Sequence, residues 1–177
     1  MPALQNAVSA EAVYHASSDD YVCQTSWDDA RPRILVVACS DGRLQENLDE
    51  FLQARGISHY DRLFVPGGPG ALASSGYELI RHDQLRRETQ FLISAHAVEE
   101  LFLIFHGAAP DGPEAAACAD YKRKLPGLSA AQINQAQLTD VAELLRIFAW
   151  PVHLQVRIFR AEVGGDGRIR FKSLSEV

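Results

Sequence analysis

Two stretches of the chain are continuously apolar, and each is followed by polar residues. One stretch runs from Ile34 to Ala38, and the other from Leu101 to Phe105. Short apolar runs with polar ends are typical of strands buried on both faces, as in the parallel sheets of α/β proteins. The stretch from Asp61 to Val65 predicts another short strand. The pattern therefore predicts an α/β fold with a central, mainly parallel sheet.

Apolar residues at helical spacing predict helices that flank this sheet. The first helix follows the first strand and ends near Gly56, a typical C-terminal stop. A second helix is predicted from about Leu85 to Glu100. The capping box from Ser129 to Gln132 begins a third helix, which Pro151 ends. The apolar faces of the first and third helices consist of Leu44, Leu48, Phe51 and Leu52, and of Ile133, Ala136, Val141, Leu144, Leu145 and Phe148.

The end of the chain predicts a C-terminal β-hairpin. Apolar residues alternate from Val152 to Ile158, which is the period of a strand with one buried face. Gly164 to Gly167 supplies a turn, and Ile169 and Phe171 belong to the last strand. No internal repeat or linker is present, so residues 31–177 are predicted to form a single domain.

Composition and charge exclude several classes of protein. Of the 177 residues, 47% are hydrophobic and 23% are charged, which is typical of a globular protein and not of a disordered one. The net charge of −6 argues against a nucleic-acid or anionic-membrane partner, because both need a basic face. No apolar run approaches the length of a membrane span, and no signal-peptide pattern begins the chain. We therefore expect a cytoplasmic protein whose three cysteines are reduced.

Residues 1–30 differ in character from the rest of the chain. They mix Ala-rich and acidic stretches, with aromatic residues only at Tyr14, Tyr21 and Trp27. We expect an N-terminal arm, partly helical, that packs on the body of the domain or on a neighbouring subunit. Cys23 lies in this arm, and no residue pattern around it indicates a bonding partner. It is interpreted as a buried or bystander thiol.

Reactive side chains follow the two apolar runs at the point where each strand ends. Cys39, Asp41 and Arg43 follow the first run, and His106 follows the other. Ligands of parallel α/β sheets bind beyond the carboxyl ends of the strands, so a thiol and an imidazole can converge there on one zinc ion.

Simpler interpretations of these residues stay open. Asp41 can cap the following helix, and His106 can be a structural histidine. Cys39 can be a buried thiol, or a nucleophile whose pKa is lowered by Arg43 and the helix N-terminus. A tyrosine-phosphatase loop is disfavoured, because it would need arginine where Gln45 stands.

The chain resembles the β-class carbonic anhydrases over roughly residues 30–174. Cys-Ser-Asp-Gly-Arg at 39–43 is similar to the C-x-D-x-R signature of that family. The Pro-Gly-Gly loop at 66–68 is similar to its glycine-rich crossing. The helix ending near Glu100 and the LFLIFHG stretch at 101–107 resemble the elements that supply its zinc-binding histidine, and the closing hairpin matches its last elements.

The resemblance implies a zinc enzyme, a lyase that hydrates carbon dioxide or hydrolyses a similar small molecule. Cys39 and His106 would be zinc ligands. Asp41 and Arg43 would form a dyad, in which the carboxylate orients the zinc-bound hydroxide or takes the fourth place on zinc, and the guanidinium holds the carboxylate. The family also implies a homodimer or higher homo-oligomer, with a small-molecule substrate or anion as the other partner.

The chain departs from this family at the third zinc ligand, because it lacks the His-x-x-Cys motif. Ala109 stands three residues after His106, and the next thiol, Cys118, lies twelve residues after it. In one account, residues 107–117 are an insertion and Cys118 supplies the ligand. In the other, Asp41, Asp111 or water completes a weaker site, or no metal binds. The alternative function is then a metal-free homologue that acts as a small-anion binding or regulatory module.

Overall fold

A computed structural model describes residues 22–75, 78–147 and 150–174 of this chain. The chain divides into two units, Met1–Ala30 and Arg31–Val177. In the first unit, residues 22–30 form neither helix nor strand, and the expected helical part of the arm falls on residues outside the described ones. The fold that follows is that of the second unit.

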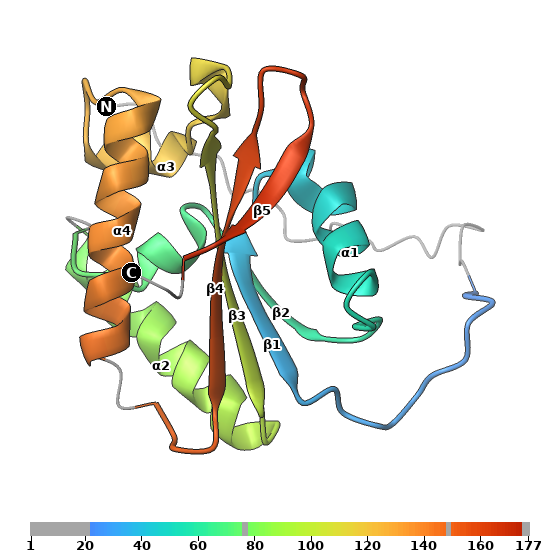
Figure 1. Ribbon diagram of the computed structural model, residues 1–177. Helices are drawn as coiled ribbons and strands as arrows, with labels where there is room; N and C mark the ends of the chain where they lie inside the picture. Colours follow the sequence, from blue (N-terminus) through green and yellow to red (C-terminus); the bar gives the residue numbers. More distant parts are fainter. Residues whose placement is uncertain (1–21, 76–77, 148–149, 175–177) are drawn as a thin grey trace, which may run out of the picture. The chain divides into compact units, whose positions relative to one another are not determined.

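Five strands form one sheet in the order β2-β1-β3-β4-β5 (Figure 1). The first four strands of that order are parallel, and β5 pairs antiparallel with β4 as the second half of a hairpin. The predicted α/β fold with a mainly parallel sheet and a C-terminal β-hairpin is therefore confirmed. The strands are β1 (Ile34–Cys39), β2 (Asp61–Val65), β3 (Glu100–Ala108), β4 (Gln155–Val163) and β5 (Ile169–Ser173).

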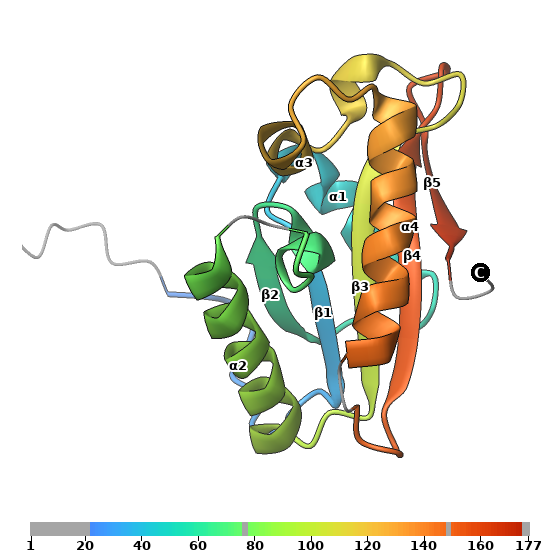
Figure 2. The same cartoon turned by 90° about the vertical axis from the view of Figure 1, so that its left-hand side faces the viewer.

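Helices cover both faces of this sheet, with α1 on one face and α2 and α4 on the other (Figures 1 and 2). The short helix α3 lies near the upper end of the sheet in Figure 2, between β3 and α4 in the sequence. The helices are α1 (Gln45–Gln53), α2 (Leu79–Ala95), α3 (Ala119–Lys124) and α4 (Ala130–Ile147), with 3₁₀ turns η1 (Gly42–Leu44), η2 (Gly68–Ala71) and η3 (Glu114–Ala116).

The continuous apolar runs are explained by two separate core clusters, one on each face of the sheet. Alternate residues of a strand point to opposite faces, so Val36 contributes to the cluster under α1 and Val37 to the cluster under α2 and α4. The β3 residues Phe102 and Leu103 divide in the same way. Both faces of β1 and β3 are covered, and a polar residue within either run would be buried without solvent.

Several predicted boundaries were wrong. The second helix was expected from Leu85 to Glu100, but α2 begins at Leu79 and ends at Ala95. Leu79 and Ile80 are largely exposed, so they add no apolar face that a pattern could reveal. The helix ends because Ala97 has a left-handed backbone (φ 50°) and Glu100 already belongs to β3.

The strand predicted from Val152 begins three residues later, at Gln155, because a turn follows Pro151 in which Leu154 N donates to Pro151 O. Val152 is fully exposed. Leu145, expected to face inward, is about half exposed. Phe148, expected on the same face, lies outside the described residues.

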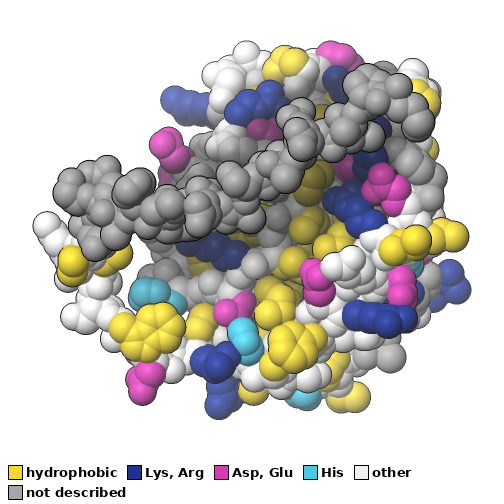
Figure 3. All heavy atoms as spheres, turned by 180° about the vertical axis from the view of Figure 1, so that it is seen from behind, with side chains coloured by type: hydrophobic (Ala, Val, Ile, Leu, Met, Phe, Trp, Pro, Cys, Tyr) yellow, Lys and Arg dark blue, Asp and Glu magenta, His cyan; other side chains and the backbone are white. Residues whose placement is uncertain are grey.

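The described part of the surface shows no single kind of side chain over the face seen in Figure 3. Basic, acidic and apolar side chains are interspersed there. No helix in the described ranges is both long and apolar enough to cross a membrane. The cytoplasmic location, the homo-oligomer and the small-molecule partner stay predictions.

The loop after β2 crosses the end of the sheet at very short range. Gly67 and Gly68 both have left-handed backbones, with φ of 87° and 55°. A Cβ atom at Gly68 would lie 2.7 Å from the backbone nitrogen of Cys39 and 3.3 Å from the carbonyl oxygen of Ile104. The structure therefore confirms the tight crossing beside the first strand, because any side chain at Gly68 would meet backbone atoms.

We expect Gly68→Ala to destabilise the protein well beyond the cost of its backbone conformation. Gly56→Ala is the matched control, since Gly56 also has a positive φ (78°) but open space around its Cβ position. That control should lose about 1–2 kcal/mol of unfolding free energy from left-handed strain alone. Gly68→Ala should lose more by about 1–3 kcal/mol, the usual cost of overpacking. Urea unfolding measures both, and equal losses would contradict the close approach.

Candidate metal centre

Three potential metal ligands come from three different elements. Cys39 is the last residue of β1, His106 lies near the end of the neighbouring parallel strand β3, and Cys118 immediately precedes α3. β1 and β3 run in parallel register, with Ala38 opposite Ile104. The two strands therefore bring Cys39 and His106 to the same edge of the sheet, as predicted.

The structure also brings Cys118 to this edge. The sulfur atoms of Cys39 and Cys118 and a ring nitrogen of His106 all lie within 4.8 Å of one another. The segment that separates Cys118 from His106 in sequence continues β3 to Ala108, makes the turn η3 and returns to the sheet before α3. This geometry favours the account in which Cys118 supplies the third ligand, while metal binding itself stays a prediction. The predicted start of the loop at residue 107 was wrong, because Gly107 and Ala108 still pair with β4 as part of β3.

The substitute ligands considered from sequence do not join this cluster. Asp111 lies at the hairpin turn, where its Oδ2 accepts from Gly165 N at 3.3 Å. Ala109, at the position where a cysteine was missing, donates its backbone N–H to Val163 O at 2.9 Å. Both oxygens of Asp41 accept from Arg43 instead.

The chemistry of the three side chains fits a zinc ion. His106 is 3% exposed, and its Nε2 is a buried polar atom without a hydrogen-bond partner among the described residues. Such an atom is costly unless something binds it. Ligand atoms of tetrahedral zinc with two thiolates and one imidazole lie about 3.5–3.8 Å apart, so only a small adjustment would be needed. Gln137 Nε2 donates to the His106 carbonyl at 2.8 Å and holds this part of β3 in place.

The two thiols have opposite pKa shifts, because only one of them can ionise easily at this distance. A hydrogen bond from Cys118, opposed by burial and assisted by His106, lowers the pKa of Cys39 to about 4. The same contact with Cys39, together with burial, raises the pKa of Cys118 well above its ordinary value. The pair therefore shares one proton in the absence of a cation, and a divalent ion would favour the loss of that proton as well.

Asp41 and Arg43 form the predicted pair at the start of the turn η1. Arg43 Nε donates to Asp41 Oδ1 at 2.9 Å, and Arg43 Nη2 donates to Oδ2 at 2.5 Å. Asp41 also accepts the backbone N–H of Arg43 at 3.1 Å, so the helix-cap interpretation of this residue is correct too. The hydrogen bonds from Arg43 lower the pKa of the carboxyl group of Asp41 to about 2, although burial opposes them. Asp41 is thus an oriented carboxylate at neutral pH.

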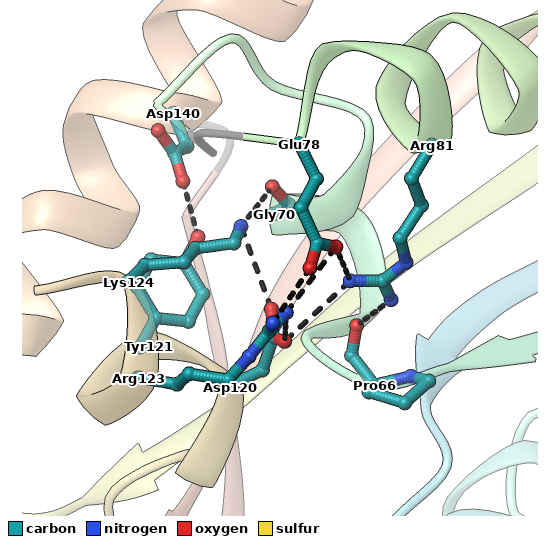
Figure 4. Close-up of polar contacts among 9 residues, drawn as sticks. All are labelled: Pro66, Gly70, Glu78, Arg81, Asp120, Tyr121, Arg123, Lys124 and Asp140. Carbon is teal, nitrogen blue, oxygen red and sulfur yellow. Dashed lines mark hydrogen bonds and ion pairs between the residues drawn. The ribbon is translucent and has the colours of Figure 1, made fainter.

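A polar cluster next to Cys118, buried on one side and exposed on the other, was missed by reasoning from sequence. It consists of Asp120, Tyr121, Arg123 and Lys124 of α3, Arg81 and Glu78 near the start of α2, and Asp140 of α4 (Figure 4). Tyr121 is fully buried and donates its hydroxyl to Asp140. The only signal for this cluster in the sequence is an acidic residue and an aromatic residue directly after Cys118, which is also the pattern of an ordinary helix start.

Comparison with known proteins gives similarity to solved structures only. No family model matches the chain, and no curated protein matches it. The carbonic anhydrase of Streptococcus mutans is 19% identical, with 83% of this chain and 86% of that chain covered and a TM-score of 0.47. β-Carbonic anhydrase isoform I of Trichomonas vaginalis is 14% identical, with 83% and 86% covered and a TM-score of 0.44. The β-carbonic anhydrase CafA of Aspergillus fumigatus is 16% identical, with 83% and 78% covered and a TM-score of 0.44.

The burial of the Asp140 carboxyl group predicts a specific dependence of stability on pH. Burial raises the pKa of Asp140 above its ordinary value near 3.8. As pH rises from that value to the raised pKa, the unfolded chain loses the proton before the folded chain does, so the folded state is progressively disfavoured. Relative to Asp140→Asn, the wild type should therefore lose unfolding free energy over this window and then level off, as measured by urea unfolding at stepped pH.

Asp166→Asn supplies a control of opposite sign. The guanidinium of Arg170 lowers the pKa of Asp166, so the wild type should gain stability relative to this variant as pH rises through the lowered pKa toward 3.8. If the difference in unfolding free energy between wild type and variant changed with pH in the same direction for both variants, the raised pKa of the buried Asp140 would be contradicted.

Proposed function

We propose that Cys39, His106 and Cys118 hold a zinc ion, and that the protein hydrates carbon dioxide or hydrolyses a similar small molecule. The observation that carries this proposal is the convergence of two thiols and a ring nitrogen of the buried His106 within 4.8 Å, at the carboxyl ends of parallel strands. Three protein ligands with a fourth position open are the usual composition of a catalytic zinc site.

Zinc, when bound, would supply the Lewis acidity that lowers the pKa of a water molecule to about 7 and so provides hydroxide at neutral pH. The chain's own contribution is orientation. Arg43 holds both oxygens of Asp41, so the carboxylate can accept a hydrogen bond from the attacking hydroxyl only in a fixed direction. His106 is buried in β3, and one of its ring nitrogens lies within 4.8 Å of both sulfur atoms.

Cys39 borders a small apolar cavity on the face of the sheet that α1 covers. The cavity has a volume of about 10 Å³, and its remaining lining comes from β1, η1, α1, β3, β4 and β5. Apolar walls exclude water and strengthen electrostatic interactions in the site. The other residues that line this cavity are Ala38, Leu44, Leu48, Ile104, Ala161 and Phe171.

The metal site predicts about one zinc per chain in protein purified under reducing, chelator-free conditions. Cys118→Ala should lose the metal or bind it at least about 100-fold more weakly, because two protein ligands fall short of a stable zinc site. Cys23→Ala is the matched control, since it removes an exposed thiol from the N-terminal unit and should keep its zinc. Elemental analysis by mass spectrometry gives the stoichiometry.

Zinc absent from the wild-type protein under those conditions would overturn the proposal. It would favour the alternative, in which the same cleft serves a metal-free homologue as a binding or regulatory module for a small anion. Equal zinc in wild type and Cys118→Ala would instead remove Cys118 from the ligand set.

The dyad predicts that Asp41→Asn lowers the rate of carbon dioxide hydration by about 100-fold or more with the zinc content unchanged, because an amide cannot orient the attacking group as the carboxylate does. Asp166→Asn is the control, since Asp166 forms a similar Asp–Arg pair, with Arg170 Nη2 at 2.6 Å, in the exposed hairpin. Stopped-flow measurement with a pH indicator follows the reaction. An unchanged rate in zinc-loaded Asp41→Asn would remove the dyad from the mechanism.

A further inference from the structure

We propose that Asp120 is the positioning residue for Cys118: its buried carboxylate fixes the start of α3 against the glycine loop after β2 and thereby holds the third ligand within reach of Cys39 and His106. This inference rests on the proposed zinc site. It concerns a residue that would not touch the metal and that acts through its neighbour two positions earlier in the chain.

The carboxylate of Asp120 is almost fully enclosed by cations. Its side chain is 3% exposed, and three basic groups converge on it (Figure 4). Arg123 Nη2 lies 2.8 Å from Oδ1, Arg81 Nη1 lies 3.5 Å from Oδ1, and Lys124 Nζ lies 3.6 Å from Oδ2. A buried carboxylate is tolerated only with such compensation, and removing its charge would take the ion-pair partner from Lys124, whose side chain is 4% exposed.

Two of these cations also bind the loop that crosses the sheet. Arg81 Nη2 donates to Pro66 O at 2.6 Å, and Lys124 Nζ donates to Gly70 O at 2.7 Å. One carboxylate therefore ties α2, α3 and both ends of the loop together (Figure 4). The loop has no side chain of its own with which to make these links, so the cations bind its carbonyl oxygens.

Direct packing completes the attachment of α3 to the loop. A Cβ atom at Gly67 would lie 2.4 Å from Asp120 Oδ2, so the carboxylate lies directly against the Gly67 backbone. A Cβ atom at Gly70 would lie 2.0 Å from the hydroxyl of Tyr121. Both glycines therefore admit α3 to a position that any other residue would block.

The same loop touches the first ligand on its other side. A Cβ atom at Gly68 would lie 2.7 Å from the backbone nitrogen of Cys39, so Gly68 packs directly against the Cys39 backbone. The Gly67–Gly68 pair thus lies between Cys39 and Asp120. Contacts through the loop therefore connect the segment that carries Cys39 with the segment that carries Cys118. Asp120 supplies the charged contact on the Cys118 side.

The first experiment compares zinc affinity in Asp120→Asn and Glu78→Gln by competition with a chromophoric chelator. Glu78 pairs with Arg81 and Arg123, as Asp120 does, but its side chain is 38% exposed and, among the described residues, its ion pairs are with these two arginines. We expect Asp120→Asn to weaken zinc binding by about 10–100-fold, the usual effect of losing support for a ligand. Glu78→Gln should stay within about threefold of wild type. Equal affinity in wild type and Asp120→Asn overturns the inference and leaves the proposed zinc site intact.

The second experiment separates positioning from a general loss of structure. Both substitutions are combined with Cys118→Ala, and zinc affinity is measured again. If Asp120 acts through Cys118, Asp120→Asn should have no further effect in the Cys118→Ala background. Cobalt-substituted Asp120→Asn should also lose part of the thiolate-to-cobalt charge-transfer absorption while the cobalt remains bound. An undiminished effect in the Cys118→Ala background would show that Asp120 only stabilises the fold, and would overturn the inference.

A third experiment needs no metal. Phenylarsine oxide condenses with two neighbouring thiols, forming two As–S bonds and releasing one water, so its capture reports that Cys39 and Cys118 are adjacent. In a Cys23→Ser background, the wild-type pair should capture the arsenical as a bridged adduct by mass spectrometry, and Asp120→Asn should capture it more slowly by about tenfold. Capture at equal rates overturns the inference. A wild type that captures the arsenical but binds no zinc rejects the proposed function without rejecting the positioning role.

Should Asp120→Asn fail to fold, Arg81→Gln replaces it in all three measurements. Arg81 is partly exposed, and it bridges Pro66 and Asp120 from the α2 side. A smaller loss in the same direction supports the inference, and wild-type zinc affinity and arsenical capture in a folded Arg81→Gln protein contradict it.

Discussion

The close approach of the Gly67–Gly68 backbone to the end of β1 is the constraint on which the candidate site depends. Gly68 leaves room for the Cys39 backbone on one side, and Gly67 leaves room for the Asp120 carboxylate on the other. The loop therefore fills the space between two segments that each carry a thiol. Without it, the parallel strands would still place Cys39 beside His106, but α3 would lose the backbone against which Asp120 and Tyr121 pack.

A buried polar network is added to core packing in only one half of this site. Cys39 and His106 are held by strands in a densely packed core, where Leu35, Val37, Leu103 and Phe105 are fully buried. Cys118 is buried in the same core, and its segment is held in addition by ion pairs and hydrogen bonds between α3, α2 and the loop. Packing tolerates change by small readjustments, whereas a buried network depends on every partner being present. The Cys118 half is therefore more sensitive to a single polar substitution.

Much of the fold followed from periodicity, because the residues that determine it are neighbours in the sequence. The apolar runs before Cys39 and His106 indicated strands buried on both faces, and the glycine-rich turn at residues 164–167 indicated the hairpin. The start of α2 escaped this reasoning, because Leu79 and Ile80 are exposed and give no one-sided pattern. The buried role of Asp120 escaped it as well. Its neighbours Arg123 and Lys124 form a pattern that is ordinary on an exposed helix, and its burial depends on Arg81 and Gly67, 39 and more positions away in the chain.

The sequence by itself determined the half of the site that lies on strands: a thiol, a carboxylate and a guanidinium follow one apolar run, an imidazole follows another, and parallel strands bring their ends to one edge. Only the tertiary structure decided where Cys118 lies. The number of residues between His106 and Cys118 follows no helix or strand period, so it does not predict where Cys118 lies. Long-range contacts of α3 with Gly67 and Gly70 set that position. Such contacts depend on shape and on buried charge, neither of which is expressed in local spacing.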